Sequence, residues 1–145
     1  MDTVKDLDGK NYVEKIKSLL INNPKCMLIV PLDSQRTCVC PMNVKSIDEN
    51  GNIWFLSHKE SEHFEVIQEK GDVLLTFANY TDKEYLSITG VGVHYDSKDL
   101  IDKFWDNEDV QCFKKGKNDS DIVALKVSVV NAYCWDITEQ KSIAI

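Results

Sequence analysis

Apolar and polar residues alternate with two different periods along the first third of the chain. Between positions 12 and 20 the apolar residues recur at helical spacing, and the Asn-Asn-Pro sequence at 22–24 supplies a stop. Short connections of hairpin length separate the next β-rich runs, which are residues 26–32, 37–47 and 52–57. The pattern predicts one helix followed by a three-stranded antiparallel meander.

The rest of the chain continues the β pattern, with helices inserted at two places. Ser57 and Glu60 have the spacing of a capping box, so we predict a helix from Ser57 to about Lys70. Ser97 begins a second helical pattern, and a short helical turn is predicted at 109–115. Three further runs are predicted as strands, namely residues 73–80, 85–95 and 122–136.

Pro41, Gly90 and Gly92 constrain the strands that contain them. Pro41 removes one ladder donor, so its strand is expected at an edge or a bulge. The two glycines indicate a bend of the kind that closes a barrel. The hairpin-length early connections disfavour a doubly wound parallel sheet. We therefore predict a mainly β fold, a six-stranded antiparallel barrel with flanking α-helices, formed by residues 1–145 as a single domain.

Composition and charge mainly exclude partners. The chain has 145 residues and a formal net charge of -7, with no evident basic face for nucleic acid or an anionic membrane. Its apolar runs are far shorter than the roughly 20 residues of a membrane-spanning helix, and the N-terminus lacks the apolar segment of a signal peptide. We expect a cytoplasmic protein that binds neither nucleic acid nor membrane.

Five cysteines, an odd number without a secretory signal, predict reduced thiols rather than a disulfide framework. Cys38 and Cys40 would share one face of a strand, where packing is the favoured role and a redox role stays open. His58 and His63 lack the usual spacing of zinc ligands. We therefore predict no metal site.

The segment after residue 56 carries the strongest chemical signal. A helix that starts at Ser57 would present unpaired backbone N–H groups, and its dipole would favour an anion. Lys59, Ser61 and His63 would add donors around the same point. The hypothesis is a local phosphate site, and the alternative is an ordinary capped surface helix.

Several segments, in this order, resemble the pyridoxamine 5'-phosphate oxidase-like, flavin-binding split-barrel family, most closely its general stress protein subgroup. The segments that carry the resemblance are 40–42, 51–57 with Lys59 and Ser61, 73–78, 87–90, 113–116 with Asp121, and 132–136. The resemblance implies a six-stranded split β-barrel. It also implies a homodimer that binds FMN in clefts at the subunit interface.

The resemblance assigns roles to ten residues. Pro41 and Met42 are expected along the flavin ring, and Tyr85 and Ser87 near its polar edge. The ribityl chain and phosphate are expected at Ser57, Lys59, Ser61 and His63. Phe113 and Trp135 match aromatics that approach the cofactor, often from the partner subunit; packing in the core or the dimer interface is an equal alternative for them.

Two positions depart from the subgroup, which commonly has arginine in place of Cys40 and lysine in place of His63. Both changes remove fixed positive charge, and one lost charge-assisted contact costs about 1.5 to 3 kcal/mol. We therefore expect weak FMN binding, unless Arg36 reaches the site from the preceding turn. If His63 holds the phosphate, FMN affinity should fall as pH rises from about 6 to 8.

The leading functional hypothesis is an FMN-dependent oxidoreductase linked to stress response, with NADH or NADPH as its reductant. No catalytic residue is assigned. Residues 138–145 lack the arginine and histidine that pyridoxamine phosphate oxidation would require by resemblance, so that reaction is not expected. The alternatives are a non-catalytic flavin-binding or sensing dimer, a dimer that binds no flavin, and a haem protein that uses His58, His63 or His94.

Overall fold

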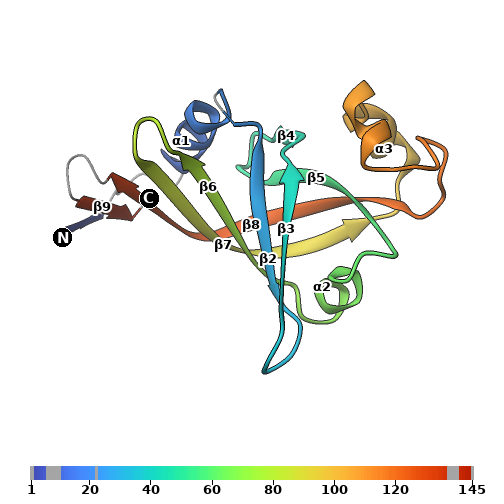
Figure 1. The fold of residues 1–145 in the computed structure, drawn as a ribbon, viewed down its shortest axis with the longest axis horizontal. Helices are drawn as coiled ribbons and strands as arrows, with labels where there is room; N and C mark the ends of the chain where they lie inside the picture. Colours follow the sequence, from blue (N-terminus) through green and yellow to red (C-terminus); the bar gives the residue numbers. More distant parts are fainter. Residues whose placement is uncertain (1, 6–10, 22, 137–140, 145) are drawn as a thin grey trace.

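A single curled sheet organises the chain in the computed structural model, which describes residues 2–5, 11–21, 23–136 and 141–144 (Figure 1). The described residues form nine strands in the order β1-β9-β8-β7-β6-β2-β3, with β5 paired to β8 and β4 paired to β5. The strands are β1 (Asp2–Lys5), β2 (Lys25–Pro31), β3 (Thr37–Asn43), β4 (Ser46–Ile47), β5 (Ile53–His58), β6 (Asp72–Asn79), β7 (Glu84–Tyr95), β8 (Ile122–Asp136) and β9 (Lys141–Ala144). The helices are α1 (Asn11–Leu20), α2 (Phe64–Lys70), α3 (Lys98–Phe104) and the 3-10 helix η1 (Asn107–Gln111).

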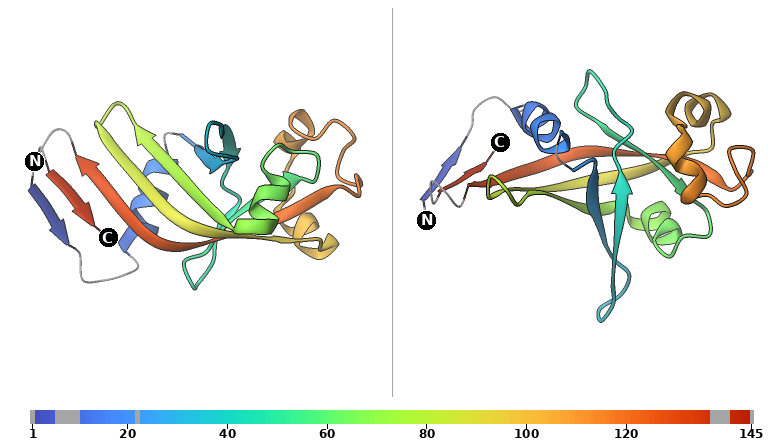
Figure 2. Two further views of the ribbon diagram at one scale, coloured as in Figure 1. Left: turned by 90° about the horizontal axis from the view of Figure 1, so that it is seen from below. Right: turned by 45° about the horizontal axis from the view of Figure 1, so that its top comes forward.

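The two longest strands, β7 and β8, give the molecule its shape. They run beside each other along its length, from the end near α3 to the end near β9 (Figure 2). Their register shifts between Thr89 and Gly90, and a Cβ at Gly90 would lie 2.7 Å from the Ser128 carbonyl oxygen. The predicted bend at this glycine is confirmed as a β-bulge, and only a residue without a side chain fits there.

Two hydrophobic clusters lie on opposite sides of β5. Phe55 belongs to the main core, which α1 and strands β2, β6, β7 and β8 surround. Leu56 belongs to a smaller cluster with Ile101 and Phe104 of α3 and Ile122 of β8. Because successive side chains of a strand point to opposite faces, β5 is buried on both sides and carries Leu56 and His58 on its outer face.

The predicted mainly β, antiparallel fold is confirmed, but the strand count of six is too low. The six predicted strands correspond to β2, β3, β5, β6, β7 and β8. The predicted run 37–47 is interrupted at residues 44–45, so its end is the separate strand β4, and β1 and β9 were not predicted. Strands of two to four residues are too short for a periodic signal. Pro41 lies in β3, which pairs only with β2 among the described residues, so its edge position is confirmed.

The predicted start of the second helix is wrong. Ser57 lies in β5 and pairs with Val123 of β8, and α2 begins only at Phe64, after a turn. The residue before α2, His63, makes no side-chain capping hydrogen bond. Pairing with β8 continues β5 through Ser57, so tertiary structure overrides the local capping signal.

Three other helix features follow the sequence. Gly71 ends α2 with a φ of 80°, the left-handed conformation that glycine favours. Ser97 caps α3 by accepting a hydrogen bond from the Leu100 amide at 3.3 Å. None of the helices in the described segments has the length and apolar character that a bilayer crossing requires.

Candidate functional site

Two adjoining hollows lie beside the face of β5 that carries Leu56 and His58. The smaller, about 80 Å³, is bordered by Pro41 and Met42 of β3 and by Leu56. The larger, about 290 Å³, is bordered by His58 and the residues that follow η1. Both hollows include Cys112 and Phe113 in their linings, so they lie on either side of these residues. We call these two hollows together the Phe113 cleft. Its lining includes Pro41, Met42, Lys45, Leu56, His58, Glu60, Asp109, Cys112, Phe113, Lys114, Lys115 and Asp119.

A buried ion pair holds the segment that carries Phe113. The Lys45 Nζ lies 2.6 Å from Asp109 Oδ2 and 3.0 Å from Asp106 Oδ2, and the Lys45 and Asp109 side chains are 6% and 2% exposed. Burial lowers the pKa of Lys45, but the hydrogen bonds that Lys45 donates to Asp109 and Asp106 outweigh burial and raise the pKa overall. The Phe113 amide then donates to the Asp109 carbonyl at 2.9 Å, which fixes the backbone beneath the ring.

His58 joins β5 to the loop that closes the cleft. Its Nε2 lies 2.8 Å from Asp119 Oδ2, and its ring stacks with Phe113 at a centroid distance of 6.4 Å. The Glu60 amide donates to His58 Nδ1 at 3.1 Å, so Nε2 carries the proton and donates it to Asp119. The Asp121 amide and then His58 lower the pKa of Asp119.

The same hydrogen bonds bear on metal binding. One ligand atom each from His58, Asp119 and Asp121 lies within 4.8 Å of the others. Because His58 Nδ1 already accepts a hydrogen bond, a metal at Nε2 would require a fully deprotonated imidazole. The arrangement therefore favours a hydrogen-bonded support for the loop over a metal centre.

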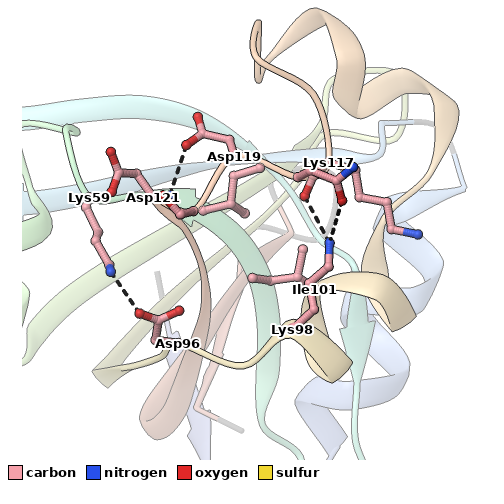
Figure 3. A pocket seen from close by; sticks show the side chains of 10 residues that line it. Lys59, Asp96, Lys98, Ile101, Lys117, Asp119 and Asp121 are labelled. Carbon is pink, nitrogen blue, oxygen red and sulfur yellow. Dashed lines mark hydrogen bonds and ion pairs between the residues drawn. The ribbon is translucent and has the colours of Figure 1, made fainter.

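Lys59 faces a different cavity, of about 450 Å³, beside α3 (Figure 3). Its Nζ lies 2.8 Å from Asp96 Oδ2. Lys98 and Lys117, which line the same cavity, both contact Asp102, at 3.1 and 3.3 Å. The lysines that line this cavity are therefore neutralised by carboxylates from the chain itself.

The predicted phosphate residues do not gather around a helix start. Ser57 and His63 are buried, at 4% and 3% exposure, and Ser61 Oγ lies 3.4 Å from His63 Nδ1. Burial lowers the pKa of His63, which favours a neutral ring. None of Ser57, Lys59, Ser61 and His63 lines the Phe113 cleft, so their assignment to the phosphate stays a prediction.

The environment of Cys40 is also unfavourable for an anion. Burial, then Cys38 and Glu62, raises the pKa of Cys40 to about 11, so the thiol is neutral. Glu62 is thus close to the position where the subgroup commonly has arginine. Arg36 does not replace that charge, because its Nε is 2.9 Å from Asp33 Oδ2. The neutral thiol of Cys40 and the neighbouring Glu62 disfavour a phosphate beside Cys40.

The other predicted site residues form a separate group at the far end of β7 and β8. Tyr85 pairs with Trp135 and Ser87 with Tyr133, so these four side chains share one face of the sheet. Tyr133 and Trp135 are 43% and 40% exposed. Within one chain, Pro41, Met42 and Phe113 border one hollow, and Tyr85, Ser87 and Trp135 do not line it. Ser87 lies in the same cross-strand row as Pro41, with Thr76 and Met27 between them.

Sequence reasoning missed several residues of the Phe113 cleft. Leu56 and His58 could have been found from strand alternation once β5 was known to continue through His58. Lys114 and Lys115 were noted only as part of a resembling segment. Their two positive charges directly after an aromatic residue were the available signal.

Comparisons with known proteins agree on the fold. A protein from Clostridium acetobutylicum related to general stress protein 26 of Bacillus subtilis has a TM-score of 0.79 at 13% identity, with 94% of each chain covered. An FMN-binding protein related to pyridoxamine 5'-phosphate oxidase, from Nostoc punctiforme, has a TM-score of 0.74 at 12% identity, over 93% of this chain and 96% of the other. The general stress FMN/FAD-binding protein of Xanthomonas citri has a TM-score of 0.71 at 21% identity, over 85% and 87%.

At the level of sequence, no curated protein matches. The family described as pyridoxamine 5'-phosphate oxidase like matches residues 11–145, nearly the whole chain. This match agrees with the fold and with the segments that carried the resemblance. The chain therefore belongs to the pyridoxamine 5'-phosphate oxidase-like family.

Proposed function

We propose that this protein binds a flavin, specifically FMN, in the Phe113 cleft. The proposal rests on one observation. Pro41 and Met42 of the edge strand β3 line the same hollow as the aromatic ring of Phe113. An edge strand offers unpaired backbone N–H and C=O groups, and an aromatic ring offers a flat apolar face. A flavin ring has a hydrogen-bonding edge and apolar faces, so it matches both.

The names of two structural neighbours support this choice of ligand. The Nostoc protein is described as FMN-binding and the Xanthomonas protein as FMN/FAD-binding. FMN is the specific form proposed for this chain, as the resemblance implies.

The proposed active form is a homodimer in which a second copy completes the cleft. Tyr85, Ser87, Tyr133 and Trp135 of each protomer share one face of the sheet, on which Tyr133 and Trp135 are 43% and 40% exposed, and none of the four lines the Phe113 cleft. Aromatic residues exposed on a sheet face are typical of protein interfaces. The partner's copy of this face would then supply the aromatic and polar contacts that the resemblance predicted.

The redox chemistry would belong to the flavin, which exchanges electrons when bound. The residues of the chain would orient the ring and exclude water from it. NADH or NADPH is the proposed reductant, and an oxidoreductase role in stress response is the proposed context. A cytoplasmic location is part of the same proposal.

A non-catalytic flavin-binding or sensing dimer is the second candidate, and one observation favours it. The titratable pair Lys45 and Asp109, which lines the ring end of the cleft, is locked in a buried salt bridge. Such a pair is not free to exchange a proton with a substrate. Oxidation of NADH or NADPH by the FMN-loaded protein would distinguish an enzyme from a sensor.

A visible absorption spectrum tests flavin binding directly. The purified protein is mixed with FMN, passed through gel filtration and scanned for the flavin band. We expect about one FMN retained per subunit in the wild type and in the control Tyr80→Ala, since Tyr80 is 76% exposed and lies outside the cleft. Phe113→Ala should lose most of the band. A colourless wild type would refute the proposal.

A further inference from the structure

Three sulfur side chains lie in a row on one face of the edge strand β3. Cys38, Cys40 and Met42 alternate with the exposed Val39 and Pro41, and all three pack against the main hydrophobic core while staying partly exposed. Among the described residues β3 pairs only with β2, so this row lies at the edge of the sheet (Figure 1). The two thiols of the row are therefore neither sealed in the core nor fully in solvent.

These two thiols contact each other. The side chains of Cys38 and Cys40 are hydrogen-bonded, and both cysteines are free of disulfides. A disulfide does not suit their spacing, because the Cα atoms of residues i and i+2 in an extended strand are about 6.6 Å apart, near the upper limit for that bond. Since the two sulfur atoms already meet, one ion can bridge them.

The number of donors narrows the choice of ion. In the described part of the chain, neither thiol belongs to a group of three cysteine, histidine or carboxylate side chains that converge on one point. Zinc in structural sites takes four such ligands, so this pair does not suit zinc. Monovalent copper is soft, prefers sulfur ligands and accepts two of them. The thioether of Met42 and the buried thiol of Cys26, which interacts with Cys40, add further polarizable sulfur around the pair.

From this geometry we infer that Cys38 and Cys40 form a two-sulfur chelate for monovalent copper. Binding breaks two S–H bonds and forms two Cu–S bonds, the protons pass to the solvent, and copper keeps its oxidation state, so no redox partner is required. This site departs from the prediction of no metal site, which rested on zinc spacing. Neither cysteine lines the Phe113 cleft, so the inference does not depend on flavin binding.

The surroundings of the pair oppose the loss of protons, and the Cu–S bonds must outweigh them. Burial raises the pKa of Cys40 to about 11. Glu62 interacts with both thiols and disfavours the negative charge that one monovalent ion leaves on two thiolates. Arg36, which interacts with Glu62, partly offsets that carboxylate. Glu62→Gln should therefore tighten copper binding about two- to threefold.

Competition with a coloured chelator of monovalent copper, without oxygen, tests the inference on the full chain. We expect wild type to retain one copper ion per chain. Cys38→Ser and Cys40→Ser should each bind copper about 100-fold more weakly, because the second bond of a chelate forms at a high effective concentration. The matched control Cys112→Ser removes a more exposed, single thiol and should bind as wild type does. Circular dichroism checks that each variant is folded.

Alkylation by a maleimide gives a second test, which needs no variant. Copper should protect Cys38 and Cys40 of the wild type, measured by peptide mass spectrometry, whereas Cys112 should react with and without the ion. If the wild type does not retain copper, or if both serine variants retain it as tightly as wild type, the inference is wrong. Equal weakening in Cys112→Ser, or protection of Cys112 in place of the pair, would also refute it.

Discussion

His58 and Asp119 lie 61 positions apart in the sequence, yet His58 Nε2 and Asp119 Oδ2 are 2.8 Å apart. This hydrogen bond connects the end of β5 to the loop that carries Phe113, Lys114 and Lys115. Phe113 packs against Trp105 and the smaller hydrophobic cluster, and Lys98 of α3 donates hydrogen bonds to the Lys117 carbonyl and to Asn118 Oδ1. The His58–Asp119 hydrogen bond is therefore the contact that ties this loop to the end of β5.

The first prediction concerns this connection. Asp119→Ala removes the hydrogen-bond acceptor of His58 and of the Asp121 amide, so the loop should lose its fixed position. We expect both FMN and riboflavin to bind more weakly, because the Phe113 ring would lose its fixed position. Titration of the two flavins by fluorescence quenching measures this. Unchanged affinity for both flavins would show that this hydrogen bond does not position the loop.

The second prediction concerns the buried pair of Lys45 and Asp109. Lys45→Met leaves the Asp109 carboxylate buried without its cation, and loss of one partner of a buried pair costs about 3 to 5 kcal/mol. The free energy of unfolding in urea should fall by that amount. Lys59→Met is the matched control, since its pair with Asp96 is exposed and should contribute little. Equal effects of the two variants would contradict the importance of burial.

The third prediction is a loss of stability in acid. Burial, and then the neighbouring His63, lowers the pKa of His94 to about 4, whereas a histidine in the unfolded chain titrates near 6.5. Between pH 4 and pH 6.5 His94 is protonated in the unfolded chain but not in the folded protein. The stability that the neutral His94 contributes is therefore complete above pH 6.5 and is lost as pH falls towards 4. We expect His94 to account for on the order of 2 kcal/mol of that loss.

Urea unfolding at pH 7 and pH 4.5 measures this effect. The variant His94→Gln cannot take up the proton and should show a smaller difference between the two pH values than the wild type. His63, whose pKa burial also lowers, and the aspartates will leave part of the difference in place. An unchanged pH difference in His94→Gln would mean that His94 does not contribute.

The fourth prediction concerns the β-bulge. Gly90→Ala would place a Cβ 2.7 Å from the Ser128 carbonyl oxygen, so β7 or β8 must move. Forced contacts of this kind cost about 1 to 3 kcal/mol, which thermal unfolding would detect. At Gly116, by contrast, a Cβ meets no atom within 4 Å, and the cost of Gly116→Ala is limited to its positive φ, about 1 kcal/mol. A larger effect at Gly116 than at Gly90 would contradict this account.

The fifth prediction tests the proposed dimer. Tyr133→Asp puts a charge on the exposed face that also carries Tyr85 and Trp135. If this face contacts a second copy, light scattering should show a shift from dimer to monomer and FMN retention should fall with it. Val110→Asp, which places a charge at an exposed apolar position in η1, is the control and should stay dimeric. A wild-type monomer that retains FMN would overturn the proposed assembly.

Local sequence signals predicted the elements whose formation depends on neighbouring residues. Helix α1 follows from its apolar spacing, the end of α2 from Gly71, and the start of α3 from Ser97. The β2–β3 and β6–β7 hairpins followed from short connections, and the segments around Pro41 and Phe113 pointed to the family that the comparisons show. Each of these signals acts over a few residues, so the sequence alone was enough to read it. The predicted three-stranded meander is wrong, because β5 pairs with β4 and β8 and not with β3.

Only the tertiary structure decided where β5 ends and what its side chains meet. Pairing with β8 keeps Ser57 in a strand. The alternation of side chains along β5 then places Leu56 and His58 on one face, where each borders a hollow that Phe113 also lines. The same pairing buries Ser57 and turns Lys59 towards Asp96. Contacts between residues 40 to 60 positions apart depend on how the strands assemble, and no local pattern of polar and apolar residues encodes that distance. The sequence by itself determined the strands, the helices and the family; long-range pairing decided which of their residues share a site.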